Sequence, residues 1–573
     1  MPRRTAAWWL ITLTVLVGAV LIGRVLLWRP LPVSDAVLPD RFVRVSGVAH
    51  VHTTHSDGGG TIADVQQAAA ATDLDFVIVT DHNTLIGKPQ EGYSETGVLT
   101  IVGTEVSNHQ GHLLAVGIPS QTYRFSGDGL DAMEDIRDSG GLAFAAHPEH
   151  AREGLRWTGW NLPGNWGVEV LNGDTQWRAA SWSSLTASTL LYPLNPTYAV
   201  LRMMTHPTAL TSWDHVLLQR HATAIAGTDA HGPLRLPRLM SLTLPSYETL
   251  FQIARNHVLL EQPLSGRAST DIDVILDALE QGRTYIGVDG LAPADRFYFV
   301  AERNGDMRMM GAIFETGSHV FLRAGGAFPV DAVLTLLRDG QKVATSRAPL
   351  EVAVTEPGSY RVEVHVPGWN MPWIMSNPIY ILDDATRASR ALAAVMPDPL
   401  VSEAATILDV FDSDTTFETV ADETSTVNAE TSDPMAGPDG SAAARIGFEL
   451  GIPSLDNNPS PFASLVSYSA RDLSEYEGLV FSVKSDRNYR FWIQLRDPNP
   501  RAQDQTESWF ASIKSTPRWR SVTLPFSRLK SLDPHTDRQL DLTHTEAIVF
   551  LVDLGGVAPG TAGTIWIDDL GVY

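Results

Sequence analysis

The sequence VAHVHTTHSDG occupies residues 48–58, and it places two histidines, His50 and His52, at the end of an apolar run. In a β-strand, side chains two residues apart point to the same face, so both imidazoles would lie together. Two nitrogen ligands on one strand make half of a transition-metal site. Asp57, on the glycine-rich stretch that follows, can add a carboxylate. A His-x-His pair alone is a weak signal, so the rest of the chain must supply matching ligands.

Apolar runs that end in His, Asp or Glu recur along the next 180 residues. They cover residues 75–80, 98–102, 141–146, 167–171 and 223–226. In a (β/α) barrel, the carboxyl ends of the strands converge on one mouth, where active sites lie. The residues that follow these runs can therefore meet in one cluster: His82, Glu105, His147, Asp229 and His231.

Helical patterns separate the apolar runs, as a barrel of this kind requires. After the first run, Thr61 is placed as an N-cap, and apolar residues recur at helical spacing behind it. These residues are Ile62, Val65, Ala68 and Ala69.

Length and composition restrict the classes of function. A chain of 573 residues is too long to fold around one hydrophobic core, so we expect about three domains. Its net charge of −24 argues against nucleic-acid binding, which needs a basic surface. Because the chain has no cysteine, a metal site must rest on imidazole and carboxylate ligands.

The N-terminus predicts a membrane anchor over residues 1–29 and a linker over residues 30–43. An apolar run extends from Ala6 to Gly23, and Arg3 and Arg4 precede it. A run of this length can span a bilayer, and the two arginines favour the cytoplasmic side. The alternative is a cleaved signal peptide. We expect a single-pass cell-membrane protein whose catalytic domain is extracytoplasmic, either periplasmic or extracellular.

Six motifs occur in order within residues 44–292: His50-x-His52, Ser56-Asp57-Gly58, Thr80-Asp81-His82-Asn83, Gly103-Thr104-Glu105, Ala146-His147-Pro148 and Gly227-Thr228-Asp229-Ala230-His231. In this series of motifs the chain resembles the polymerase and histidinol phosphatase (PHP) superfamily. The resemblance implies a distorted (β/α)7 barrel that holds two or three divalent ions of Zn, Mn or Fe. It is closest to the branch that includes carbaryl hydrolase-like proteins, in which a β domain with a segment like residues 372–380 follows the barrel.

The resemblance also implies a division of the ligands among three ions. The first ion would be held by His50, His52, Glu105 and Asp229. Glu105 would bridge to a second ion that His147 also holds. The third ion would be held by Asp57, His82 and His231.

Two further residues have roles that the motifs leave open. His112 stands where a further ligand or an acid/base group could enter, and it is the candidate catalytic residue. Asp81 either orients His82 or caps a turn. His55, His109 and His150 lie beside the motifs and are expected at the rim or in solvent.

Residues near the predicted mouth could contribute to substrate binding. Lys88, Arg152 and Arg235 are candidate cations for a phosphoester, although each is more typical of an ordinary surface residue. Residues 149–219 form a long insert that is rich in tryptophan. These aromatic side chains either wall the pocket or, as we favour, pack the outer helices.

Beyond the barrel the pattern changes to β structure. Residues 293–384 alternate with period two and predict a β-sandwich, in which His319 and His365 are isolated structural residues. After a linker at 385–404, residues 405–573 resemble a galactose-binding-like jelly roll. Trp509 and Trp519 could stack on a sugar, but core packing is the commoner explanation.

These expectations combine into a multidomain α/β and all-β protein with an N-terminal transmembrane helix. The predicted function is a membrane-anchored, metal-dependent hydrolase, in which a hydroxide held by two metals attacks a phosphoester of small-molecule or envelope origin. One alternative is hydrolysis of a carbamate, amide or carboxylic ester on the same fold. The other is a non-catalytic protein that binds glycan or envelope components.

Overall fold

The computed structural model describes the chain except at residues 1, 40–41, 121–122, 126, 233–244, 318, 348, 397–399, 413–414, 454–459, 503–504, 532 and 534. At residues 2–12, 15 and 431 it describes the backbone only. Contacts divide the chain into two compact units. The first contains residues 1–119 and 136–396, and the second contains residues 120–135 and 397–573.

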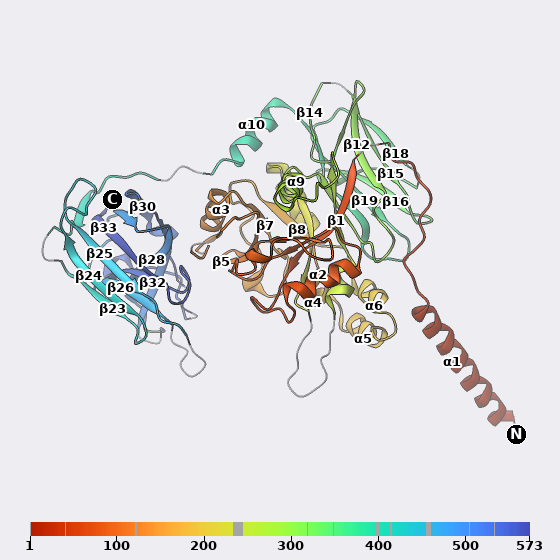
Figure 1. The fold of residues 1–573 in the computed structure, drawn as a ribbon, viewed down its shortest axis with the longest axis horizontal. Helices are drawn as coiled ribbons and strands as arrows, with labels where there is room; N and C mark the ends of the chain where they lie inside the picture. The colour runs from red at the N-terminus through yellow and green to blue at the C-terminus, as the bar shows by residue number, and fades with distance from the viewer. Residues whose placement is uncertain are drawn as a thin grey trace. The chain divides into compact units, whose positions relative to one another are not determined.

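The N-terminal segment forms helix α1 (Pro2–Leu26) (Figure 1). Among the described residues, no helix is both long enough and apolar enough to cross a membrane. The anchor over residues 1–29 is therefore not confirmed and stays a prediction. Behind α1, Trp28 packs against Tyr198 and Trp369 of the first unit.

A closed β-barrel forms the centre of the first unit (Figure 1). Strand β9 pairs in parallel with both β8 and β1, and β1 pairs in parallel with β2. With β4 and β5 taken as one continuous strand, the described residues supply the seven positions of the expected distorted barrel. The strands are β1 (Val43–Val51), β2 (Phe76–Val79), β4 (Leu99–Val102), β5 (Thr104–Asn108), β6 (Gly111–Val116), β7 (Leu142–Ala145), β8 (Gly167–Asn172) and β9 (Ala224–Ala230).

The barrel departs from a regular (β/α) repeat at strand β6. This strand pairs antiparallel with both β5 and β7, whereas β7 and β8 are parallel. An antiparallel neighbour runs in the opposite direction, so the first residues of β6 lie at the level where other strands end. His112, the second residue of β6, is thereby brought to the mouth.

Local sequence determines the first barrel helix, α2 (Ile62–Ala71), as predicted. Thr61 caps its N-terminus and forms a reciprocal capping box with Asp64. The residues that face the barrel are those with the predicted helical spacing: Ile62, Val65, Ala68 and Ala69. Their burial fastens α2 over the strand that carries His50.

Strand β8 divides the insert expected at residues 149–219, and the part that follows β8 is mostly helical. This part contains α4 (Gly173–Ala179), α5 (Trp182–Leu191), α6 (Pro196–Met203) and α7 (Ala209–Gln219). Trp213, on α7, is buried, as packing of the outer helices predicts. Trp157 and Trp166 are also buried, but they precede β8. Trp182, in contrast, is 86% exposed.

The β-sandwich expected at residues 293–384 is joined to the barrel through its sheets. One sheet contains β13 (Asp306–Met309), β12 (Phe297–Arg303), β15 (Val320–Gly326) and β18 (Leu350–Val354). The remaining strands belong to the same sheet system as the barrel: β14 (Ile313–Glu315), β16 (Val333–Arg338), β17 (Gln341–Ser346), β19 (Gly358–His365), β20 (Pro372–Ser376) and β21 (Ile379–Leu382). Strand β20 pairs with β11 (Thr284–Gly287), β11 with β10 (Arg255–Leu260), and β10 with β1. This chain of pairings gives the barrel and the sandwich a continuous sheet.

Three further helices complete the first unit. Helix α8 (Tyr247–Phe251) precedes β10, and α9 (Ala268–Glu280) lies between β10 and β11. Helix α10 (Asp384–Ala393) follows β21 at the end of this unit.

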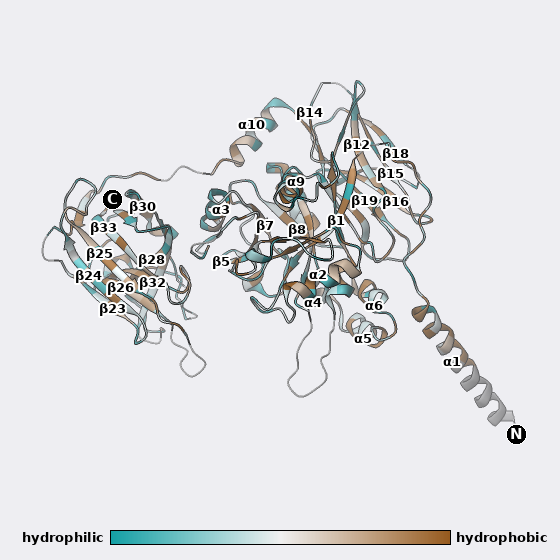
Figure 2. Cartoon of the chain, in the orientation of Figure 1, coloured by the Kyte–Doolittle hydropathy of each residue, from teal (hydrophilic) through white to brown (hydrophobic). Residues whose placement is uncertain are grey.

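The second unit is a two-layer β-sandwich, joined by residues 120–135, which include the start of α3 (Gly129–Asp138). One layer contains β22 (Thr406–Asp409), β24 (Thr426–Asp433), β25 (Ala443–Glu449), β33 (Ala562–Val572), β27 (Gly478–Ser485) and β30 (Arg520–Pro525). The other contains β23 (Phe417–Ala421), β26 (Phe462–Ser467), β32 (Ala547–Asp553), β28 (Tyr489–Pro498), β29 (Thr506–Ser515) and β31 (Lys530–Ser531). Figure 2 shows hydrophobic residues along the strands of both layers, whose inner faces form one core.

The two tryptophans considered for sugar stacking are engaged within this sandwich. Trp509 is 7% exposed and its indole donates a hydrogen bond to Asp497. Trp519 donates to the carbonyl of Ala436, and the ammonium of Lys484 lies 4.8 Å from its ring centre. Core packing therefore accounts for Trp509.

Candidate metal centre

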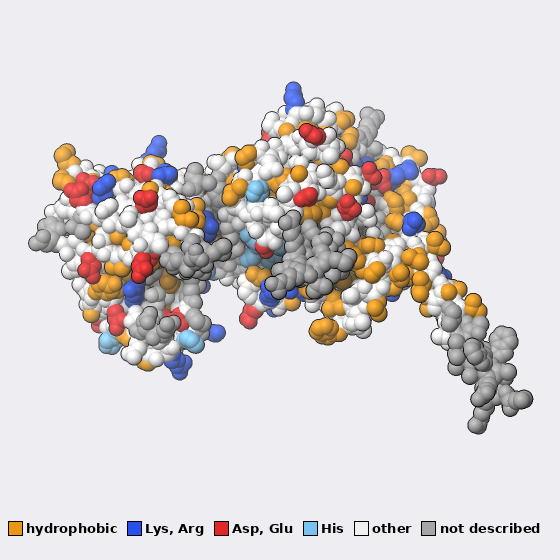
Figure 3. Space-filling view, turned by 60° about the horizontal axis from the view of Figure 1, so that its bottom comes forward, with side chains coloured by type: hydrophobic (Ala, Val, Ile, Leu, Met, Phe, Trp, Pro, Cys, Tyr) orange, Lys and Arg blue, Asp and Glu red, His pale blue; other side chains and the backbone are white. Residues whose placement is uncertain are grey.

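The barrel mouth gathers imidazole and carboxylate groups from the ends of five strands and from the start of β6. Histidine side chains reach the surface of the first unit in the space-filling view (Figure 3). The imidazole and carboxylate ligand atoms at the mouth form four overlapping groups, and within each group the atoms lie within 4.8 Å of one another. The groups contain all nine candidate residues: His50, His52, Asp57, His82, Glu105, His112, His147, Asp229 and His231.

Glu105 lies at the centre of these groups, and its two carboxylate oxygens face different imidazoles. Oε1 lies 2.6 Å from Nδ1 of His112 and 2.8 Å from Nε2 of His147. Oε2 lies 3.2 Å from a ring nitrogen of each of His50, His52 and His82. One buried carboxylate thus joins two sets of nitrogen ligands.

The first set is almost fully buried and includes the carboxylate of Asp229, whose side chain is 8% exposed. Its Oδ1 lies 3.5 Å from Nε2 of His50 and 3.4 Å from Nε2 of His52. Both histidine side chains have no exposed surface. Ligands about 2.0–2.2 Å from a tetrahedral ion are separated from one another by about 3.4 Å, so these spacings suit a shared ion.

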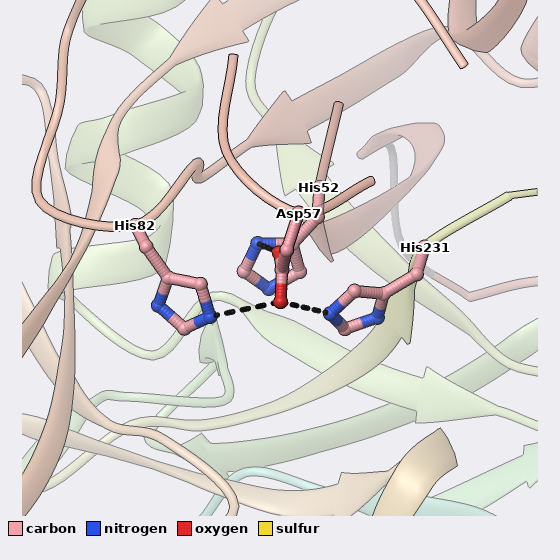
Figure 4. A group of neighbouring side chains, drawn as sticks. All are labelled: His52, Asp57, His82 and His231. Carbon is pink, nitrogen blue, oxygen red and sulfur yellow. Dashed lines mark ion pairs between the residues drawn. The ribbon is translucent and has the colours of Figure 1, made fainter. Parts of the chain in front are cut away.

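A more open set lies toward solvent and is centred on Asp57, whose side chain is 55% exposed. Figure 4 shows Oδ2 of Asp57 between the rings of His82 and His231, with His52 behind it. The oxygen is 3.7 Å from Nε2 of His82 and 3.3 Å from Nε2 of His231. This part of the centre is open to solvent, whereas the side chains of His50 and His52 have no exposed surface.

Strained backbone positions three of these residues. His50, His147 and Asp229 have positive φ angles of 61°, 29° and 51°. The pairing of β1 with both β2 and β9 shifts register around His50, which indicates a bulge there. Such conformations cost about 1–3 kcal/mol each and persist where function requires a particular side-chain direction.

Glu169 is a buried carboxylate that the sequence analysis did not select. Its Oε1 is 2.8 Å from Nδ1 of His50, and its Oε2 accepts the backbone N–H of His147 at 2.5 Å. The Asn172 amide donates to Oε2 of Glu169 and to Oδ2 of Asp229. An acidic residue in the middle of the apolar run 167–171 was the available signal, since a buried charge requires partners.

Gly227 leaves the space that Glu169 occupies. A Cβ atom at residue 227 would lie 1.4 Å from Oε1 of Glu169 and 2.9 Å from Cβ of His50. Any side chain at residue 227 would therefore displace the contact that orients His50.

Asp81 stabilises a turn, and turn capping was one of the two roles considered for it. Its carboxylate accepts hydrogen bonds from the backbone N–H and the hydroxyl of Thr53, at 2.7 Å each. The hydroxyl of Ser56 donates to it at 2.6 Å. These bonds hold the loop that presents Asp57.

The electrostatics of the cluster fit bound cations. Burial raises the pKa of Glu105, but His50 and the hydrogen bonds of His112 and His147 outweigh this effect and hold the pKa well below its usual value. Burial lowers the pKa of His52, but contacts with Asp229 and Glu105 raise it to about 9. Nε2 of His50, Nε2 of His52 and Oε2 of Glu105 are buried without a well-aligned hydrogen-bond partner among the described residues. A divalent ion would satisfy these three atoms together.

A cavity of about 800 Å³ opens beside the cluster. Its floor includes Asp57, His82, Glu105 and His231. Its walls come largely from the insert and are mainly apolar: Leu155, Leu185, Tyr192, Val200, Met203 and Met204. The cavity is large enough for a substrate with a bulky apolar group.

His150 lies on this cavity wall and is 2% exposed, which corrects its expected place at the rim. Its Nδ1 accepts the N–H of Arg152, so its Nε2 carries the proton that it donates to Asp174 at 3.0 Å. Asp174 also pairs with Arg178 at 2.5 Å. These three side chains form a hydrogen-bonded row beside the candidate metal ligands. In contrast, His55 and His109 belong to none of the ligand groups.

The predicted substrate-binding cations differ in their relation to the cavity. Arg152 lines the cavity, and so does Arg178, which was not predicted. Lys88 pairs with Glu91 at 2.7 Å and is not part of the cavity lining. Arg235 lies outside the described residues.

No family model and no curated protein matches this chain. A solved two-domain protein from Bacteroides vulgatus, described as containing a predicted PHP-like metal-dependent phosphoesterase, is 17% identical over 61% of this chain and 99% of its own, with a TM-score of 0.27. The family 11 carbohydrate-binding module of Clostridium thermocellum, in complex with a β-1,3-1,4-mixed-linked tetrasaccharide, is 17% identical over 29% of this chain and 94% of its own, with a TM-score of 0.24. The likeness to carbaryl hydrolase-like proteins stays a prediction.

Proposed function

We propose that this chain is a metal-dependent hydrolase whose catalytic centre is the barrel mouth. The observation that carries the proposal is the position of Glu105, which presents one oxygen to His112 and His147 and the other to His50 and His52. A carboxylate with this arrangement is suited to bridge two divalent ions. Zn, Mn and Fe are the metals that mixed imidazole and carboxylate ligands favour.

The proposed ligand sets follow the geometry. Asp229 joins His50 and His52 on the Oε2 side of Glu105, and His112 joins His147 on the Oε1 side. The third set consists of Asp57, His82 and His231. We assign His112 to the ligands because it shares a ligand group with His82 and Glu105 and its Nδ1 lies 2.6 Å from Oε1 of Glu105.

Bound ions supply Lewis acidity and lower the pKa of water, which is the chemistry of ester hydrolysis at neutral pH. The residues of the chain provide the rest. Glu169 orients His50, Asp81 fixes the loop of Asp57, and the apolar cavity excludes water from the substrate. Arg152 and the His150–Asp174–Arg178 row provide hydrogen-bond donors on one wall.

The proposed substrate is an ester that carries a large apolar group. The walls of the cavity fit such a group, while the open Asp57 set receives the polar ester. A phosphoester remains the expected reaction centre. Hydrolysis of a neutral carbamate or carboxylic ester is the second candidate, because Arg178 is already paired with Asp174 and leaves less positive charge for a phosphate.

The test compares two substrates on the full chain loaded with manganese or zinc. One is an activated phosphodiester with a long alkyl group, and the other is an aryl carbamate with a similar group. Phosphodiester turnover that His50→Ala abolishes, and that an exposed-histidine control, His319→Ala, leaves unchanged, supports the phosphoesterase. Carbamate turnover alone would select the second candidate.

A purified chain that binds no metal and turns over neither substrate would contradict the enzyme and favour a non-catalytic binding protein. The proposed membrane location is tested separately with a reporter fused after Tyr573. Reporter activity restricted to the cytoplasm would contradict the extracytoplasmic assignment. Glycan contact through residues 405–573 is likewise a proposal, and titration with soluble glucans tests it.

A further inference from the structure

A second cluster of ligand-type side chains lies outside the barrel mouth, where the insert meets β19. His206 follows helix α6, and Glu363 and His365 lie at the end of β19. The i, i+2 spacing of Glu363 and His365 places both side chains on one face of the strand, as was argued for His50 and His52. His365 was expected to be isolated, but it has two ligand-type neighbours.

The three side chains converge on one carboxylate oxygen. Nε2 of His365 lies 3.0 Å from Oε2 of Glu363, and Nε2 of His206 lies 3.5 Å from the same atom. The two imidazole rings are nearly parallel, with an interplanar angle of 7° and centres 6.2 Å apart. Both rings thus direct the same nitrogen toward the same oxygen.

The other oxygen of Glu363 is held from behind. Oε1 accepts a hydrogen bond from Arg361 at 2.6 Å, and Glu363 is only 5% exposed. Two further hydrogen bonds of 2.7 Å join Arg361 to Asp214 on helix α7. This support leaves Oε2 as the oxygen that points toward the histidines, and it resembles the outer hydrogen bonds that orient carboxylate ligands of metals.

Arg361, Asp214 and Glu363 together carry one negative charge that no cation among them balances. The carboxylate of Asp214 balances Arg361 through the paired hydrogen bonds. Glu363 then adds a second, almost fully buried negative charge that faces two groups able to act as neutral ligands. A buried charge that is not balanced is costly, and metal coordination is one of the ways in which proteins balance it.

We propose that His206, Glu363 and His365 form a separate metal site that binds one divalent ion of the zinc type. Ligands of a tetrahedral zinc ion lie about 3.4 Å from one another, which matches the distances of 3.0 and 3.5 Å here. Two imidazoles and one carboxylate leave the fourth position for water. Because the side chains of His206 and His365 are 47% and 37% exposed, an ion can enter from solvent.

The site would fasten the insert to the β-sandwich. His206 comes two residues after Met204, and Met203 and Met204 line the substrate cavity. A metal bond between His206 and β19 therefore fixes the chain that forms this wall of the cavity. The site does not depend on the hydrolase proposal, because its ligands belong to none of the groups around Glu105.

The experiment measures zinc bound per chain after equilibration with Zn²⁺ and removal of free metal, using the full chain. His206→Ala and His365→Ala are each expected to lower the content by one equivalent. His215→Ala is the matched control, because His215 is an exposed histidine on α7 of the same insert and should leave the content unchanged. Cobalt substitution gives a second readout, since a tetrahedral Co²⁺ signal should weaken in the same two variants.

The barrel site is distinguished with His50→Ala. This variant should still bind the zinc equivalent that His206→Ala loses. The double variant should lose the zinc of both sites. Zinc content in His206→Ala and His365→Ala equal to that of the wild type would overturn the site. Circular dichroism of each variant verifies folding. His206→Ala is expected to disturb the fold less than His365→Ala, because the His206 side chain is about half exposed and its removal leaves the Arg361 pairing intact.

Discussion

Glu169 illustrates how a residue outside the candidate ligand set can support a proposed metal centre. It contacts Nδ1 of His50 with one oxygen and the backbone of His147 with the other. A carboxylate on the far nitrogen of a ligating histidine fixes the ring and its tautomer and increases its basicity. Glu169 therefore acts on both sides of Glu105 at once.

Glu169→Gln is expected to weaken metal binding by about 10–100-fold, the usual effect of removing such an outer partner. The amide keeps the shape but loses the charge that favours the correct tautomer of His50. Competition with a chromogenic chelator measures the change in affinity. Glu153→Gln, at an exposed glutamate, serves as the control. Equal affinities of the Glu169 variant and the wild type would show that Glu169 only packs.

The sequence selected the candidate ligands of this centre but not the residues that support them. His50, His82 and Asp229 follow apolar runs. They come together because the carboxyl ends of the barrel strands meet at one mouth. Glu169 lies within an apolar run rather than after it, so the same rule passed over it. Glu363 and His206 are 157 residues apart and share no motif, so only the folded chain brings them together.

At the scale of elements, the reversed strand β6 explains why His112 was the least certain candidate. A regular (β/α) repeat places functional residues after strands. His112 precedes the apolar run that it belongs to, and it reaches the mouth because β6 is antiparallel to its neighbours. The apolar pattern predicts a strand but is the same for both directions, so strand direction was not available from the sequence.

The turn between β20 and β21 joins the barrel to the β-sandwich through one side chain. The Asn377 amide accepts the N–H of Ala224 and donates to the carbonyls of Ala224 and Thr284. These partners begin strands β9 and β11, and Asn377 is 1% exposed. The segment of residues 372–380, noted in the sequence only as a resemblance, thus has a definite structural role.

Asn377→Ala is expected to lower the free energy of unfolding of the first unit by about 2–4 kcal/mol, because it leaves buried backbone groups without partners. Urea denaturation followed by tryptophan fluorescence measures the change. Asn161→Ala, at an exposed loop position, should stay within about 0.5 kcal/mol of the wild type. A similar small effect at Asn377 would mean that water replaces the lost hydrogen bonds.

At the scale of the molecule, the second unit includes a segment that the sequence assigned to the barrel. Residues 120–135 lie within the barrel sequence, yet they belong with residues 397–573. Period-two patterns predicted the sandwich itself, because alternating burial is a local property. The attachment of residues 120–135 depends on charges far apart in the chain, such as Arg490 and Asp135, and no local pattern reveals such a pair.

The Arg490–Asp135 pair provides the test of this attachment. The guanidinium makes two hydrogen bonds to the carboxylate, at 2.5 and 3.1 Å, and the exposed fractions are 1% and 0%. Removing one partner of a buried pair typically costs about 3–5 kcal/mol, because the other charge stays buried. Arg490→Met and Asp135→Asn should each destabilise the second unit strongly, while the double variant should lose much less than the sum.

A double-mutant cycle on the thermal unfolding of the full chain measures this coupling. We expect a coupling energy above about 2 kcal/mol. The Arg487–Asp486 pair is the matched control, since its side chains are 54% and 35% exposed and an exposed pair contributes about 0–1 kcal/mol. Because Lys514 also reaches Asp135, at 3.0 Å, Asp135→Asn should cost more than Arg490→Met. Coupling no larger than that of the control pair would mean that residues 120–135 are held by packing rather than by charge.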